Sequence, residues 1–186
     1  SAVSDASVTF TKNTVLTNAS GTRFDIDIDR TVSLMSDNDI EKDLGFVVSQ
    51  QMKVVAYQSV NTITNIGERA WSKETGLPSV WLLGMFNPTP TTTVFIPYNE
   101  QGEGIIVNDE YFGKIPADRL IVENGMIYFK IDGLHRSKLG IPRSRVKELC
   151  GSYDSSKGVL TLLWCSLPDG PVDYVNGQWG PQDDPY

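Results

Sequence analysis

Several sequence motifs that would identify an enzymatic activity are missing from this sequence. Its 186 residues contain no glycine-rich phosphate loop, no Gly-x-Ser-x-Gly motif and no Cys-x-x-Cys pair, which mark nucleotide binding, serine hydrolases and thiol or zinc sites. The single histidine, His135, excludes a zinc site with several histidine ligands within this chain. We therefore predict no cofactor, and the residues do not decide between an enzyme and a binding protein.

Carboxylates could still hold a hard cation such as calcium, because oxygen is its preferred ligand. Two short acidic stretches, residues 37–39 and 182–184, offer such oxygens. Residues such as 37–39 more commonly cap a helix, and residues such as 182–184 more commonly form a solvated turn. We therefore predict no metal site.

Excess positive charge and long apolar runs are also lacking. The chain has 16 Lys and Arg against 23 Asp and Glu, a formal net charge of −7, and this balance disfavours binding to a nucleic-acid backbone. The longest apolar stretch, residues 80–86, is far shorter than the roughly 18 residues of a membrane-spanning helix. We predict neither a nucleic-acid partner nor a membrane span.

Only two cysteines are present, Cys150 and Cys165. Cys165 lies in the apolar run 159–167, where a free buried thiol is commoner than a disulfide; a Cys150–Cys165 disulfide is the less favoured alternative.

The chain begins without Met, which fits removal of a tag, a signal peptide or an upstream segment. We predict a periplasmic or secreted protein.

The patterns that are present indicate β-structure. Residues 24–34 alternate apolar and polar side chains with a period of two, as in a strand with one solvated face. Residues 36–45 carry an N-cap, an acidic first turn and a final glycine, which predict a short helix. Further strands are expected at 54–63, at 80–83 in a central position, and at 91–98.

Two hairpins and a second helix complete the expected elements. Asn124-Gly125 predicts a type I′ turn within residues 120–129, and residues 153–164 form the other hairpin. Pro142 begins a brief helix that ends before Gly151, and the tail from 168 onward is a loop with one strand near 174–175. These elements predict one all-β domain over residues 1–186, a sandwich or a barrel with one or two short helices.

Candidate ligand-binding residues are one arginine and several aromatic side chains. Arg30 falls on the apolar face of its strand, where its guanidinium reaches a ligand or forms a structural ion pair. Sugars stack on aromatic rings, and Trp71, Trp179, Tyr98 and Tyr111 lie in or beside expected loops. Trp81 and Trp164 lie in apolar runs and are expected in the core.

Four stretches carry a resemblance to a known group of proteins. They are residues 61–71 (NTITNIGERAW), 75–86 (TGLPSVWLLGMF), 107–120 (VNDEYFGKIPADRL) and 173–186, which contains DYVN, Trp179 and QDDPY. Over about residues 24–186 the chain resembles an uncharacterised Bacteroidetes family related to the galactose mutarotase-like proteins.

The resemblance implies an antiparallel supersandwich whose concave face binds saccharides. It places Arg30 on an early strand and residues 65–71, with Asn65 and Trp71, in a loop of the sugar face. Mutarotases use a histidine acid and a carboxylate base, but no histidine follows Asn65, and His135 does not match the catalytic motif. Similar proteins also continue beyond the equivalent of Tyr186, so the chain is expected to be a piece of a longer sandwich.

The favoured function is carbohydrate binding in a glycan-processing system, with Arg30, Asn65, Trp71, Tyr111 and Trp179 contacting the saccharide. One alternative is a sugar-active enzyme, an epimerase or glycoside-cleaving enzyme, in which Asp109 or Glu110 acts as base and His135 as acid. Another is a structural or interaction module. An incomplete sandwich would leave a sheet edge uncovered and promote self-association.

Overall fold

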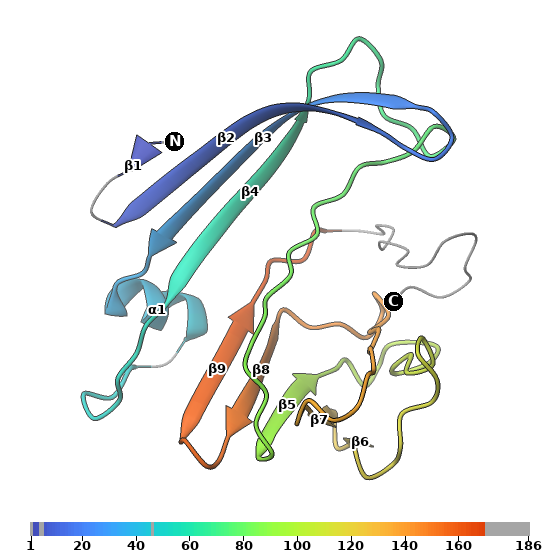
Figure 1. The fold of residues 1–186 in the computed structure, drawn as a ribbon. Coiled ribbons are helices and arrows are strands. Elements are labelled where there is room, and N and C mark those ends of the chain that lie inside the picture. Colours follow the sequence, from blue (N-terminus) through green and yellow to red (C-terminus); the bar gives the residue numbers. More distant parts are fainter. Residues whose placement is uncertain (1, 4–5, 46, 170–186) are drawn as a thin grey trace. The chain divides into compact units, whose positions relative to one another are not determined.

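The computed structural model describes residues 2–3, 6–45 and 47–169. These residues form antiparallel strands and one short helix (Figure 1). The predicted all-β fold class is confirmed. The chain divides into two compact units, Ser1–Leu83 and Gly84–Tyr186, and each contains one sheet.

The sheet of the unit Ser1–Leu83, drawn in blue and cyan in Figure 1, has the strand order β1-β2-β3-β4. Its strands are β1 (Ala2–Val3), β2 (Ser7–Thr17), β3 (Arg23–Leu34) and β4 (Tyr57–Asn65). β3 confirms the strand predicted from alternation, and β4 lies a few residues beyond the expected 54–63. The long β2 was not predicted, because threonine, lysine and asparagine interrupt its apolar alternation.

Alternation along β3 gives this sheet one apolar and one polar face. Phe24 and Ile26 are buried on the first, whereas Asp25, Asp27 and Asp29 point to the second, since successive side chains of a strand face opposite ways. The buried residues of β3 therefore lie at the Phe24 end of its apolar face.

The predicted first helix is present as α1 (Asp37–Leu44). Ser36 Oγ accepts a hydrogen bond from Asp39 N at 3.3 Å, and Asp39 Oδ2 accepts one from Ser36 N at 3.0 Å, which is a reciprocal capping box. The helix ends at Gly45, whose φ of 72° is left-handed and favours glycine. Ile40 is the buried residue of the helix.

The sheet of the unit Gly84–Tyr186 has the order β6-β7-β5-β8-β9. Its strands are β5 (Thr92–Pro97), β6 (Leu120–Glu123), β7 (Met126–Lys130), β8 (Leu149–Asp154) and β9 (Val159–Trp164). The β6–β7 turn contains Asn124 and Gly125 with φ of 51° and 73°, so the Asn-Gly hairpin is confirmed. The β8–β9 hairpin and the β5 strand are confirmed too, and Ile127 of β7 is fully buried.

Two expected elements are wrong. Residues 80–83 pair with no strand in the described part of the chain and lie in an extended segment, with Trp81 78% exposed. The helix predicted after Pro142 closes only one turn, in which Val146 N donates to Pro142 O at 2.9 Å. The carbonyl oxygen of Arg145 then accepts a hydrogen bond from Asn99 N at 2.7 Å, and the chain continues into β8. The strand expected at 174–175 lies outside the described residues.

Both cysteines are free. Cys150 is half-buried on β8, and desolvation raises the pKa of its thiol. Cys165 is exposed just after β9, so the burial expected from its apolar run is wrong. An apolar run at a sheet edge keeps only part of its surface away from water.

Asp154 fixes the turn at the end of β8. Its Oδ1 accepts hydrogen bonds from Thr91 Oγ1 at 2.7 Å, Ser156 Oγ at 2.8 Å and Ser156 N at 3.1 Å. These bonds, the one from Thr91 foremost, favour the ionised carboxylate and lower the pKa of Asp154 to about 2.

The depressed pKa predicts an acid-dependent contribution to stability. Unfolded Asp154 titrates near 3.9, so its contribution is present above about pH 4 and is lost as the pH falls toward 2. We expect Asp154→Asn to melt at a lower temperature than wild type at pH 7, and the difference to shrink between pH 4 and 2. Thermal melts followed by circular dichroism measure this; a difference that is constant with pH would contradict it.

Candidate functional site

Two loops of the unit Gly84–Tyr186 lie side by side and carry the three predicted catalytic residues together with one of the predicted aromatic residues, Tyr111. They are residues 108–114 and 133–140, called the loop pair below. Asn108 N donates to Gly140 O and Gly140 N donates to Asn108 O, both at 2.8 Å. The loop pair is thus joined by its backbone, and Asp109, Glu110 and Tyr111 lie on one loop with His135 on the other.

Aromatic and cationic side chains pack across the loop pair. The rings of Tyr111 and Phe112 meet edge to face, with centroids 4.6 Å apart and planes at 83°. Lys138 Nζ lies 4.2 Å from the Tyr111 ring centroid, and Arg136 Cζ lies 4.2 Å from that of Phe112. Such cation–π contacts hold one loop against the other, while Phe112 remains 45% exposed.

The two neighbouring carboxylates have different environments. Asp109 is 5% exposed, and its Oδ1 accepts a hydrogen bond from Lys114 Nζ at 2.7 Å. This bond raises the pKa of Lys114. Glu110 Oε1 lies 3.8 Å from the same Nζ, but the Glu110 side chain is 69% exposed. Asp109 is therefore a partner of Lys114, and Glu110 is the carboxylate that solvent and ligands reach.

His135 is exposed on the second loop. It makes no hydrogen bond or ion pair with the residues that the structure describes, including Asp109 and Glu110. An acid/base pair needs hydrogen-bond reach to a common substrate. His135 and the two carboxylates therefore lie on adjoining loops, but no hydrogen bond or ion pair connects the imidazole to either carboxylate.

A buried ion pair lies at the start of the second loop and anchors it. Arg119 Nη1 and Nη2 donate to Asp132 Oδ1 at 2.9 and 3.0 Å, and Nη2 donates to Oδ2 at 2.8 Å. Asp132 Oδ1 also accepts from Leu134 N at 3.0 Å. These hydrogen bonds hold the pKa of Asp132 well below its usual range, and those from Arg119 contribute most. The carboxylate thereby fixes the start of the loop that carries His135 and Arg136.

Three other predicted ligand residues belong to the unit Ser1–Leu83. Asn65 closes its own loop, because Nδ2 donates to Arg69 O at 2.7 Å and Oδ1 accepts from Gly67 N at 3.0 Å. Trp71 packs edge to face on Phe24, with centroids 6.4 Å apart. Arg30 is exposed and forms no ion pair within the described residues, so the buried stripe of β3 ends before it.

The other tryptophans and Tyr98 do not follow the expected division between core and loop. Tyr98, expected beside a loop site, is 7% exposed and belongs to the core. Trp81 and Trp164, expected in the core, are 78% and 43% exposed. Trp179 lies outside the described residues. Apolar runs indicate burial only where a second layer covers the strand.

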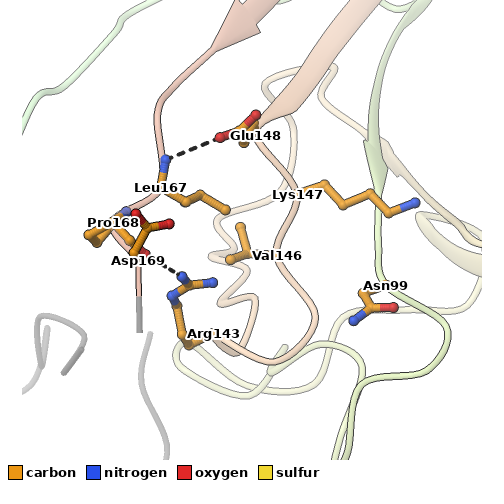
Figure 2. Close-up of a pocket in the computed structure, with 8 residues that line it drawn as sticks. All are labelled: Asn99, Arg143, Val146, Lys147, Glu148, Leu167, Pro168 and Asp169. Carbon is orange, nitrogen blue, oxygen red and sulfur yellow. Dashed lines mark hydrogen bonds between the residues drawn. The ribbon is translucent and has the colours of Figure 1, made fainter. Parts of the chain in front are cut away.

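A shallow depression of about 590 Å³ lies elsewhere in the same unit, and none of its residues was predicted (Figure 2). Its lining is Asn99, Arg143, Val146, Lys147, Glu148, Leu167, Pro168 and Asp169. Arg143 Nη2 donates to Pro168 O at 2.7 Å, and Glu148 Oε1 accepts from Leu167 N at 3.4 Å. These bonds tie the segment after β9 to the segment that precedes β8, and no sequence motif links the residues that form them.

No group of three or more His, Cys, Asp or Glu among the described residues could hold a metal ion. No helix in the same ranges is long and apolar enough to cross a membrane.

The comparisons with known proteins place the chain in a family. Residues 1–186 match the model of DUF6786, described as a family of unknown function, and the chain belongs to this family. The comparison with curated proteins and the comparison with solved structures found no match.

Proposed function

We propose that the chain binds carbohydrate and that the loop pair is its binding site. The observation that carries this proposal is an exposed aromatic ring, Phe112, and an exposed carboxylate, Glu110, on one loop, which is fixed to its neighbour by backbone hydrogen bonds and cation–π contacts. The resemblance to mutarotase-like proteins supports the same ligand class, and a glycan ligand supports a periplasmic or secreted location.

The chemistry of saccharides fits these side chains. The C–H face of a sugar ring packs on an aromatic ring, as other apolar surfaces do. Carboxylate oxygens accept hydrogen bonds from hydroxyl groups, and cationic side chains donate to hydroxyl oxygens. Arg136 contacts the Phe112 ring, and Glu110 and His135 are exposed on the same two loops, so the loop pair offers a sugar both donors and acceptors.

We propose binding without catalysis. Asp109 is already paired with Lys114, and His135 lacks a carboxylate partner among the described residues. The alternative enzyme would need Glu110 and His135 to approach one substrate from the two loops. The enzyme alternative predicts turnover that requires both Glu110 and His135. Binding without catalysis requires Glu110 and Phe112 instead.

Calorimetric titration of the saccharides selected on a glycan array tests the site. We expect Phe112→Ala and Glu110→Gln each to weaken binding by about tenfold, because each removes a contact of about 1 to 2 kcal/mol. Tyr153→Ala is the matched control, since Tyr153 is 46% exposed on β8 and Phe112 is 45% exposed. Absence of binding to any mono- or oligosaccharide, or equal losses in all three variants, would overturn the proposal.

We also propose that the chain self-associates through an uncovered sheet edge. The supporting observation is β9, which is the last strand in the order of its sheet and has Leu160 and Leu163 exposed at 48% and 60%. Light scattering at increasing protein concentration tests this; a constant monomer mass would contradict it.

A further inference from the structure

Arg136 is held on an aromatic ring but has no acceptor for its N–H groups among the residues that the structure describes. Its Cζ lies 4.2 Å from the centroid of the Phe112 ring. The side chain is exposed, and it makes no hydrogen bond or ion pair within the described ranges. A cation–π contact uses no lone-pair acceptor, so the N–H donors of the guanidinium remain available for hydrogen bonds. The ring therefore positions a set of donors that a ligand can use.

The other arginines of the unit Gly84–Tyr186 already have acceptors. Arg119 donates to the carboxylate of Asp132. Arg143 donates to one backbone oxygen at 2.7 Å, and Arg145 donates to three backbone oxygens at 2.9 to 3.0 Å. Arg136 is thus the arginine of this unit whose hydrogen-bonding capacity the described residues leave wholly unused.

The second loop of the loop pair is cationic although the chain as a whole is acidic. It contains Arg136 and Lys138 and no Asp or Glu. On the facing loop, Asp109 is buried and already paired with Lys114 at 2.7 Å, and Glu110 Oε1 lies 3.8 Å from the same Nζ. The net charge of −7 is spread over 186 residues, and salt screens exposed charges beyond about 8 Å. The local charge of the second loop therefore favours an anion.

We propose that the saccharide bound by the loop pair is acidic and that Arg136 binds its oxyanion, a carboxylate or a sulfate. This inference rests on the proposed carbohydrate function and adds the charge of the ligand. A guanidinium forms two parallel charge-assisted hydrogen bonds with two oxygens of such a group, and these are stronger than hydrogen bonds between neutral groups. Phe112 then packs against the sugar ring, Glu110 accepts hydrogen bonds from hydroxyl groups, and the acidic substituent lies toward the second loop.

Saccharides matched in pairs test the charge of the ligand. Each uronic acid on a glycan array is compared with its carboxyl-reduced neutral parent, and each sulfated sugar is compared with its unsulfated parent. We expect the acidic members to bind at least about tenfold more tightly than their parents, the typical effect of a hydrogen bond to a charged group. This preference should decrease as the NaCl concentration rises. The uronate and sulfate pairs distinguish the two sources of the oxyanion.

Substitutions of Arg136 test the residue, with affinities measured by calorimetric titration. We expect Arg136→Gln to abolish the preference for the acidic member of each pair and to change binding of the neutral parent little. Arg136→Lys keeps the charge without the planar fork of donors, so it should retain only part of the preference. Lys157→Gln is the matched control, because it removes one positive charge from an exposed position in the β8–β9 turn of the same unit. Circular dichroism melts show that each variant is folded.

The outcomes separate this inference from the proposed function. Absence of binding to any saccharide overturns both together. If neutral saccharides bind as tightly as their acidic counterparts, the carbohydrate site stands and its acidic specificity is wrong. If Arg136→Gln and Lys157→Gln reduce the preference equally, the overall charge of the chain produces it, and the role assigned to Arg136 is wrong.

Discussion

An alanine at Gly151 is expected to destabilise the unit Gly84–Tyr186 by about 2 to 3 kcal/mol, the upper range for an overpacked core position. Gly151 is buried on β8, between β5 and β9. A Cβ at this position would lie 2.5 Å from Phe95 Cζ and 3.1 Å from Leu162 Cδ2. It would also meet the backbone oxygen of Thr161, which cannot move without disturbing the β8–β9 pairing.

Urea unfolding followed by circular dichroism measures this effect. Gly84→Ala is the control, because a Cβ there would meet only the Phe86 side chain, at 3.3 Å, and Phe86 is 67% exposed and free to shift. We expect Gly84→Ala to unfold at the wild-type urea concentration and Gly151→Ala well below it. Equal midpoints for the two variants would show that β5, β8 and β9 are not packed as described.

The second large effect is expected at Asp132. Its side chain is 4% exposed, and it faces Arg119, 13% exposed, with Lys130 Nζ 3.4 Å from Oδ2. Asp132→Ala would leave the guanidinium of Arg119 largely buried without its carboxylate, which is among the most destabilising changes known for ion pairs. It also removes the acceptor of Leu134 N. We expect both a much lower melting temperature and loss of saccharide binding at the loop pair.

A double variant distinguishes the lost pair from lost packing. Arg119→Met/Asp132→Leu removes both charges and keeps similar volume, and such replacements are often neutral or stabilising. We expect its melting temperature to recover most of the loss seen in Asp132→Ala. If Asp132→Ala melts like wild type, or if the double variant is less stable than the single one, the ion pair does not anchor the loop.

Elements with local signals could be predicted from the sequence. The capping box around Ser36, the glycine at 45 and the Asn124-Gly125 turn each depend on a few neighbouring residues. They form because caps and turns satisfy backbone groups locally. Residues 80–83 lacked this advantage: their apolar composition predicts a buried strand, but a strand also needs a partner, and none pairs with them among the described residues.

The candidate site was predictable only in part. Asp109, Glu110, Tyr111 and His135 were selected for their chemistry, and the structure places them on adjoining loops. Phe112, Lys114, Arg136 and Lys138 were missed, because their roles depend on cation–π and ion-pair contacts between the loops. The sequence signal they do carry is an aromatic pair followed by Lys114 in one loop and two basic residues, Arg136 and Lys138, in the other.

Mapping the binding site on the chain tests the central proposal most directly. Backbone amide NMR shifts would be followed while the strongest saccharide from the array is added. We predict the largest shift changes at residues 108–114 and 133–140, with saturation that depends on Glu110 and Phe112. Shift changes confined to other residues, such as the depression near Arg143 or the exposed face around Tyr153, or no change with any saccharide, would contradict a carbohydrate site at the loop pair.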